Sequence, residues 1–406
     1  MREIILISFL GPDQPNQFTR LMQVLSVHSL HILDVGQAVI HNQLTLGIVV
    51  ASDDETATAL AMKEILILAH DIGLTVRFKP ISSAEYDQWV SEGGRTRYIV
   101  TALAPELTAS HLQAVTKIVS DQGFNIETVT RLSGRPALGS QQDAPQRACV
   151  QFGLSGQMLD AQAMRAACLS LSGELNIDVA VQEDNAYRRN RRLVCFDMDS
   201  TLIEQEVIDE LACEAGVGEQ VAEITERAMQ GELDFQQSFR ARVALLKGLD
   251  ASVLPRIAER LTITEGAERL ISTLKALGYR TAILSGGFQY FAEYLQDKLG
   301  IDEVHANILD VKAGVVTGEV KGAIVDGARK AELLRDLAQR MGISLEQAIA
   351  VGDGANDLPM LSIAGLGVAF RAKPLVRQNA NQAISSVGLD GVLYLLGVHD
   401  KDLTRA

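Results

Sequence analysis

Polar clusters follow short apolar segments at three places in the second half of the chain, and this pattern constrains the fold most. The pairs are LVCF (193–196) before DMDST (197–201), TAIL (281–284) before SGG (285–287), and AIAV (348–351) before GDGANDL (352–358). Wholly apolar segments of this length are typical of parallel strands that are covered by helices on both faces. Ligands of such sheets bind outside the carboxyl ends of the strands. The pattern therefore predicts an α/β domain with a polar site at one edge of its sheet.

The first cluster holds two carboxylates suited to phosphoryl chemistry. A carboxylate such as Asp197 can attack a phosphoryl group when a cation neutralises the phosphoryl oxygens. Asp199, two residues later, could protonate the leaving oxygen and afterwards deprotonate water. The pair therefore indicates a nucleophile and a general acid/base.

The other clusters supply groups that bind phosphate and metal ions. The Ser285 hydroxyl and the Gly286 backbone N–H can hold phosphate oxygens. Lys330 lies in a helical stretch (328–341) and can offer a point charge to the same phosphate. The carboxylates of Asp353 and Asp357 are hard oxygen ligands of the kind that Mg²⁺ prefers.

Taken together, DMDST, SGG, Lys330 and GDGANDL resemble the four signature motifs of the haloacid dehalogenase superfamily of phosphohydrolases. The resemblance implies a Rossmann-like core and an aspartyl-phosphate intermediate, with Asp197 as nucleophile and Asp199 as general acid/base. It also implies Mg²⁺ bound by Asp197, the backbone carbonyl of Asp199 and Asp353, with Asp357 in support. The residues implied to bind the substrate phosphate are Ser285, Gly286, Lys330 and Asn356.

Residues of about 204–261, between the first two motifs, are helix-forming and predict a small helical cap over the site. Within this segment, EVIDE (206–210) and FQQSFRARV (235–243) resemble the cap of the phosphoserine phosphatase family. The resemblance implies that Glu206 faces the substrate ammonium group and that Arg242 binds the substrate carboxylate, for which a guanidinium is well shaped. It further implies hydrolysis of L-phosphoserine to L-serine and phosphate, the last step of serine biosynthesis.

The first part of the chain contains an internal repeat. Residues 2–80 and 97–183 each predict the order βαββαβ, which indicates a duplicated α+β domain. The pair resembles tandem ACT domains, which implies serine or another amino acid as a possible effector and a homodimer. We expect ACT-like domains at 1–80 and 97–184, a polar linker at 82–95, and the phosphatase domain at 190–406.

Composition excludes several classes of partner. Lys and Arg number 37 against 51 Asp and Glu, so the net charge is −14. Such a charge repels nucleic acid and anionic membrane surfaces, and no segment approaches the ~20 apolar residues of a membrane-spanning helix. The short basic run RRNRR (188–192) is expected to be a solvated linker. The cysteines, without C-x-x-C spacing, are expected to be buried reduced thiols in a cytoplasmic protein.

Two alternatives stay open. One is an enzyme on the same core that transfers the phosphoryl group to an amino-acid alcohol instead of water. The other is an amino-acid-sensing regulatory protein whose phosphatase core is vestigial.

Overall fold

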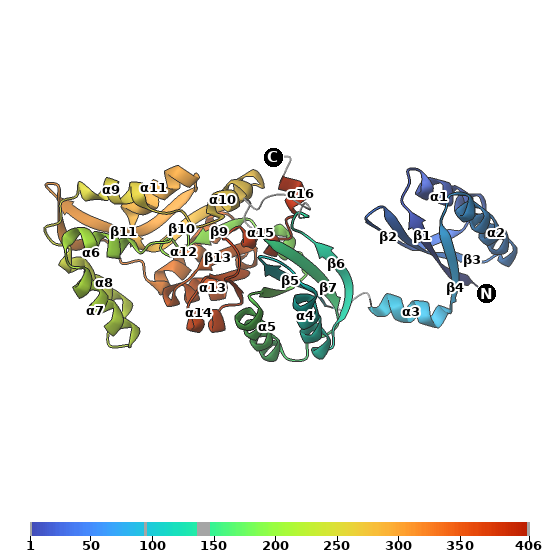
Figure 1. The fold of residues 1–406 in the computed structure, drawn as a ribbon, viewed down its shortest axis with the longest axis horizontal. Coiled ribbons are helices and arrows are strands. Elements are labelled where there is room, and N and C mark those ends of the chain that lie inside the picture. Colours follow the sequence, from blue (N-terminus) through green and yellow to red (C-terminus); the bar gives the residue numbers. More distant parts are fainter. Residues whose placement is uncertain (1, 93–95, 136–146, 404–406) are drawn as a thin grey trace. The chain divides into compact units, whose positions relative to one another are not determined.

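A computed structural model describes residues 2–92, 96–135 and 147–403, and the chain divides into two compact units, Met1–Arg95 and Thr96–Ala406. The first unit confirms the expected βαββαβ order (Figure 1). Its elements are β1 (Glu3–Pro12), α1 (Gln17–Val27), β2 (His31–Ile40), β3 (Gln43–Ser52), α2 (Glu55–Asp71) and β4 (Thr75–Ile81). The antiparallel sheet has the order β2-β3-β1-β4. His41 and Asn42, which join β2 to β3, both have positive φ, as a tight hairpin between twisted strands requires.

The segment expected to be a plain linker differs from the expectation. A helix, α3 (Ser83–Glu92), occupies most of it. The helix is started by Ser82 and Glu85, because the Ser82 backbone N–H donates to the Glu85 carboxylate and the Glu85 N–H donates to Ser82 Oγ. This reciprocal pair is a capping box. Gly93 and Gly94 lie outside the described residues.

The second unit begins with another module of the same topology, which we call the second module. Its elements are β5 (Arg97–Ala104), α4 (Ala109–Asp121), β6 (Asn125–Arg131), β7 (Ala148–Ser155), α5 (Ala161–Leu175) and β8 (Asp178–Glu183). The sheet order is β6-β7-β5-β8, which repeats the strand order of the first unit. The second helix of the module and its last strand lead directly into the remaining domain.

The remaining domain is built on a seven-stranded sheet of order β12-β11-β10-β9-β13-β14-β15. Neighbouring strands are parallel except β11 and β12. The strands are β9 (Leu193–Phe196), β10 (Arg280–Phe288), β11 (Glu303–Lys312), β12 (Val315–Lys321), β13 (Ala348–Gly352), β14 (Leu366–Phe370) and β15 (Gln382–Ile384). The helices that follow the cap are α10 (Ala267–Ala276), α11 (Gln289–Leu299), α12 (Gly327–Arg340), α13 (Leu358–Ile363), α14 (Pro374–Asn379), α15 (Gly391–Leu395) and α16 (Asp400–Leu403).

Burial on both faces explains why the central strands are wholly apolar. Val194 and Phe196 of β9 belong to one core cluster, whereas Leu193 and Cys195 belong to another. Successive side chains of a strand point to opposite faces, so both faces of this sheet need apolar residues. The expected α/β class is confirmed.

Four helices form the segment between β9 and α10. They are α6 (Val207–Ala215), α7 (Gly218–Met229), α8 (Phe235–Leu245) and α9 (Val253–Arg260). Figure 1 shows α6, α7 and α8 at the end of the second unit away from the second module. A bridge between Ile203 and Ile263 closes the base of this segment, which we call the cap. None of the described helices is long and apolar enough to cross a membrane.

Two expectations about single residues are wrong. Arg188 and Arg191 of the basic run are buried, at 8% and 6% exposure, because they pack between the second module and the sheet domain. Only part of that run is therefore a solvated linker. Cys149, Cys168 and Cys195 are buried as expected, but Cys213 is exposed on the outer side of α6.

The carboxylate of Asp178 fastens the second module to the sheet domain. It accepts hydrogen bonds from the backbone N–H groups of Ser385 and Ser386 (both 2.7 Å), from Ser386 Oγ (2.6 Å) and from Ser172 Oγ (3.1 Å). Asp178 is only 1% exposed. Buried donors that lose such an acceptor destabilise the folded state strongly.

We therefore predict that Asp178→Ala lowers the free energy of unfolding of the second unit by about 3 kcal/mol. Differential scanning calorimetry should show a fall of at least about 5 °C in the midpoint of its transition. The matched control is Asp297→Ala, at an exposed position. A midpoint that changes no more in Asp178→Ala than in the control would contradict the prediction.

Candidate active site

The polar clusters predicted from the sequence meet at one edge of the sheet. Strands β10, β9 and β13 are neighbours, and Ser285, Asp197 and Asp353 stand at or just after their carboxyl ends. The backbone N–H of Asp197 donates to Val351 O, which holds the two chain segments in register beyond β9. The parallel arrangement thus brings together side chains that are far apart in the sequence.

Lys330 lies at the centre of this edge. Its Nζ is 2.8 Å from Asp197 Oδ1 and 2.6 Å from Asp357 Oδ1. The side chains of Lys330 and Asp357 are fully buried, and Asp197 is 5% exposed. Burial alone would lower the pKa of Lys330, but the two carboxylates outweigh burial and raise it above its usual range. Lys330 is therefore charged, and it ties the end of β9 to the loop after β13.

Asp326 fixes the start of α12, the helix that carries Lys330. Its carboxylate accepts from the Arg329 backbone N–H at 2.9 Å and so caps the first turn of α12, which contains the lysine. A carboxylate at this position satisfies a free N–H of the helix and stabilises the helix start. The local sequence thus fixes where the helix begins and which residue faces the site.

Three carboxylates could hold a metal ion. Oxygen atoms of Asp197, Asp353 and Asp357 all lie within 4.8 Å of one another. Burial, together with the neighbouring Asp197, raises the pKa of Asp353 to about 8 and that of Asp357 to about 7. The cluster thus carries more negative charge than Lys330 alone relieves. Hard oxygen ligands with excess negative charge fit a divalent cation of the Mg²⁺ type.

Gly352 makes the approach of Asp357 possible. A Cβ at Gly352 would lie 2.4 Å from the carboxylate of Asp357, which no real side chain permits. The Gly354 backbone N–H donates to Asp357 Oδ2 at 2.9 Å. The first glycine of the GDGANDL segment is therefore required for the position of Asp357 within the carboxylate cluster.

Asp199 differs from Asp197 in its surroundings. Burial, then the charges of Glu206 and Asp197, raise the pKa of Asp199 well above its ordinary value. Its Oδ1 accepts weakly from the Val207 backbone N–H at 3.4 Å. These surroundings favour the protonated form of Asp199, which is the form that a general acid needs.

The SGG segment belongs to the final part of β10, and α11 begins directly after this strand, at Gln289. The pairing of β10 with β11 shifts register between Leu284 and Phe288, which frees this backbone. Ser285 is fully buried, and its Oγ accepts from the Gly287 N–H at 2.8 Å.

Asn307 holds this segment in place. It belongs to none of the sequence motifs, so its role was not predicted. Its Nδ2 donates to Gly286 O at 2.8 Å, and its Oδ1 accepts from the Val325 N–H at 2.8 Å. Asn356 also lies near Gly286, because a Cβ built there would be 3.7 Å from Asn356 Nδ2. The structure thus brings together the predicted phosphate-binding residues of the SGG and GDGANDL segments.

The cap contributes a charged pair above the carboxylates. Glu206 stands at the start of α6, and its Oε1 accepts from Ser200 Oγ at 2.9 Å. Burial raises the pKa of Glu206, and Arg242 of α8 opposes that effect. The charge of Asp209, which was not predicted as a site residue, also raises the pKa of Arg242.

The Arg242 guanidinium retains a free donor. Its Nε is buried and has no acceptor within the described part of the chain. Burial lowers the pKa of Arg242, and the charges of Glu206, Asp209 and Asp199 oppose this. A buried guanidinium N–H without an acceptor is suited to a carboxylate ligand.

Aromatic side chains of the cap cover the SGG segment. Phe235 stacks on Phe239 with ring centroids 6.0 Å apart, and Phe239 contacts Phe288 at 5.7 Å. A Cβ at Gly286 would lie 2.9 Å from the tip of the Phe235 ring. The cap therefore lies directly over the SGG segment, where a cap can exclude water from a site.

We predict that Mg²⁺ raises the thermal midpoint of the chelator-treated chain, because the cation relieves repulsion among the three carboxylates. A cation at one hundred times its Kd adds about 2.7 kcal/mol to the stability of the folded state. Asp353→Asn should lose most of this stabilisation, whereas Asp336→Asn, at an exposed position of α12, should retain it. Equal Mg²⁺ effects on both variants, measured by differential scanning fluorimetry, would place the cation elsewhere.

Comparisons with known proteins agree with this geometry. A family model for haloacid dehalogenase-like hydrolases matches residues 191–365, and an ACT domain model matches residues 3–79. The chain is 40% identical to a phosphoserine phosphatase of Streptomyces coelicolor over 99% of this chain and 94% of that protein. It is also 40% identical to phosphoserine phosphatase SerB2 of Mycobacterium tuberculosis, over 99% of this chain and 95% of that protein.

Solved structures give the same picture. A hydrolase of the haloacid dehalogenase family from Salmonella enterica has a TM-score of 0.64 at 31% identity, covering 73% of this chain and 98% of that chain. A probable phosphoserine phosphatase from Vibrio cholerae has a TM-score of 0.59 at 35% identity, covering 78% of this chain and 90% of that chain.

Proposed function

Since the chain belongs to the phosphoserine phosphatase family of haloacid dehalogenase-like hydrolases, we propose that it hydrolyses L-phosphoserine to L-serine and phosphate through an aspartyl-phosphate. The observation that carries the proposal is the contrast between two neighbouring carboxyl groups. Asp197 lies against the Lys330 ammonium, while the pKa of Asp199 is raised by burial. When the surroundings of two neighbouring carboxyl groups favour different protonation states, one group can act as nucleophile and the other as acid.

In the first step an Asp197 oxygen attacks phosphorus, the bond from phosphorus to the serine oxygen breaks, and Asp199 gives its proton to that oxygen. In the second step Asp199 takes a proton from water as the water attacks the aspartyl-phosphate, which releases phosphate and restores Asp197. In this proposal Lys330, Ser285 and the Gly286 N–H bind phosphoryl oxygens in both steps. Such preorganised donors are the main source of catalysis in phosphoryl transfer.

The cofactor that we propose is Mg²⁺, held by Asp197, Asp353 and the backbone carbonyl of Asp199, with Asp357 in support. When bound, it would supply positive charge against the phosphoryl oxygens. The excess negative charge of the carboxylate cluster supports this assignment.

The substrate is distinguished by its amino and carboxylate groups. Glu206 offers a carboxylate to the ammonium group, and the unpartnered Nε of Arg242 offers a donor to the carboxylate. A panel of L-phosphoserine, phosphothreonine, a sugar phosphate, a nucleoside monophosphate and an aryl phosphate tests this. Strong preference for L-phosphoserine in phosphate release supports the proposal, and equal rates across the panel would overturn the substrate assignment.

Transfer to an alcohol acceptor is the alternative outcome. Added homoserine should leave the yield of free phosphate from L-phosphoserine unchanged if water is the acceptor. A fall in free phosphate, with phosphohomoserine appearing in its place, would instead make the chain a phosphotransferase.

We also propose that the ACT-like modules bind serine or another amino acid and pair two copies in a cytoplasmic homodimer. The exposure of β2 along its length, including Val35 and Val39, supports pairing, because such an edge is ready to add a strand. Sedimentation of the chain with and without L-serine tests both points. A monomer whose sedimentation does not respond to L-serine would contradict them.

We predict that Asp197→Asn abolishes phosphate release from L-phosphoserine. The amide cannot act as the nucleophile, so the loss should be at least about 10⁴-fold, as for other nucleophile variants. Circular dichroism should show an intact fold. Residual turnover above one hundredth of the wild-type rate would contradict the covalent mechanism.

We predict that Arg242→Ala lowers kcat/KM for L-phosphoserine about 100-fold, because a buried charged hydrogen bond contributes about 2–3 kcal/mol. Hydrolysis of an aryl phosphate, which has no carboxylate, should fall much less. Arg240→Ala, at an exposed position of the same helix, is the control. Equal losses for both substrates would show that Arg242 does not select the carboxylate.

A further inference from the structure

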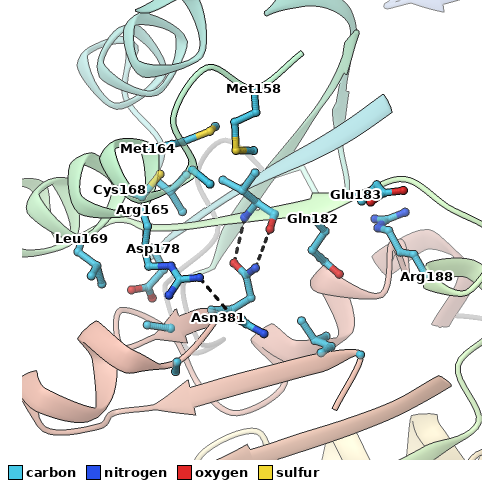
Figure 2. A pocket seen from close by; sticks show the side chains of 18 of the residues that line it. Met158, Met164, Arg165, Cys168, Leu169, Asp178, Gln182, Glu183, Arg188 and Asn381 are labelled. Carbon is cyan, nitrogen blue, oxygen red and sulfur yellow. Dashed lines mark hydrogen bonds between the residues drawn. The ribbon is translucent and has the colours of Figure 1, made fainter. Parts of the chain in front are cut away.

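A cavity of about 380 Å³ lies between the second module and the sheet domain (Figure 2). One wall is formed by α5 and β8 of the module, and the other by the start of β14, the end of α14 and β15. Leu366, which lines the cavity, is the first residue of β14. The cavity is thus at the amino end of a parallel strand, opposite the edge that carries Asp197, and it shares no residue with the proposed active site.

Buried arginines with unused donors line this cavity. Arg191 donates to Gln182 Oε1 at 2.9 Å and to Gly365 O at 3.3 Å, but its Nε has no acceptor within the described residues. Arg188 has two such atoms, Nε and Nη2. Buried donors in folded proteins almost always have a partner, so donors of this kind point to a ligand.

Arg377 adds a third guanidinium from the other wall. Its Nη2 donates to Ser172 Oγ at 2.7 Å, and that hydroxyl donates in turn to Asp178. Its Nε is buried without an acceptor in the part of the chain that the structure describes. The contact with Ser172 holds the guanidinium in one position across the join between module and sheet domain.

The nearby acidic residues neutralise these arginines only in part. Arg188 Nη1 lies 3.5 Å from the carboxylate of Asp184, which is also largely buried. Asp178 is already satisfied by the serines at residues 172, 385 and 386. Glu183 and Glu346 are exposed at the rim. Burial lowers the pKa of Arg191 to about 10, which still leaves it charged at neutral pH. Arg191 and Arg377 form no ion pair within the described residues, so the cavity keeps cationic donors in a chain of net charge −14.

Apolar side chains also line the cavity, next to Arg165 of α5. Figure 2 shows Met158, Met164 and Cys168 together on one side, while Gln182 and Arg188 lie on another. Methionine side chains are flexible and polarizable, so they fit apolar groups of varied shape. The cavity thus offers cationic donors and an apolar surface within one small volume, as ligand pockets do.

We propose that this cavity is a binding site for a small organic anion, in which a carboxylate or phosphate group binds the arginines and a short apolar chain contacts the methionines. Guanidinium groups recognise both kinds of anion through paired N–H donors. Because the ligand touches both walls, it also stabilises the association of the second module with the sheet domain.

The test is isothermal titration of the full chain, loaded with Mg²⁺, with three probes: hexanoate, hexylphosphonate and hexanol. The first two share the apolar chain and differ in the anionic group, whereas hexanol lacks the charge. Two variants remove the site: Arg377→Gln removes a donor, and Ala161→Trp fills the cavity from an exposed lining position. Arg335→Gln, at an exposed position of α12, is the control. Activity on L-phosphoserine and circular dichroism verify that each variant is folded.

We expect at least one of the two anions to bind wild type and the Arg335→Gln control equally, with hexanol at least tenfold weaker. Affinity should fall at least tenfold in Arg377→Gln and in Ala161→Trp. The tighter anion then identifies the head group. If hexylphosphonate binds at the active site, its affinity there should be the same in all variants, which distinguishes that binding from binding in the cavity. No binding of either anion, equal binding of hexanol, or unchanged affinity in both cavity variants would overturn the proposal.

Discussion

The ion pairs of Lys330 with Asp197 and Asp357 determine how the catalytic edge is assembled. One ammonium group lies within 2.8 Å of two carboxylates that come from different strands, and all three side chains are buried. Burying charges is unfavourable unless each one is paired, and removal of one partner is strongly destabilising. The end of β9, the loop after β13 and the first turn of α12 therefore keep one relative position.

The rest of the site follows from the charges that this arrangement leaves unbalanced. Asp353 joins the two paired carboxylates, and the cluster then has an excess of negative charge that a divalent cation can relieve. Burial favours the protonated form of Asp199, which stands two residues after Asp197. Above it, Arg242 keeps a buried donor without an acceptor. One fully buried lysine thus gives the proposed nucleophile, acid and metal ligands different surroundings.

The sequence predicted those features that depend on residues close together in the chain. Apolar segments followed by Asp197, Ser285 and Asp353 revealed the strand ends and the chemistry, because side chains at the ends of parallel strands must meet. Asn307 and Phe235 escaped prediction, since their roles depend on contacts with Gly286 from elements distant in the sequence. The burial of Arg188 and Arg191 was not predicted for the same reason. It depends on the packing of the second module against the sheet domain, which a run of arginines does not reveal.

The covalent intermediate at Asp197 is the central claim, and trapping it is the most direct measurement. The enzyme is mixed with L-phosphoserine, quenched in acid within milliseconds and reduced with borohydride, which converts an aspartyl-phosphate to homoserine. Mass spectrometry of the peptide that contains LVCFDMDST then locates the change. We predict homoserine at Asp197 and none at Asp199. Homoserine at Asp199, or turnover with no reduced residue at any time of quenching, would contradict it.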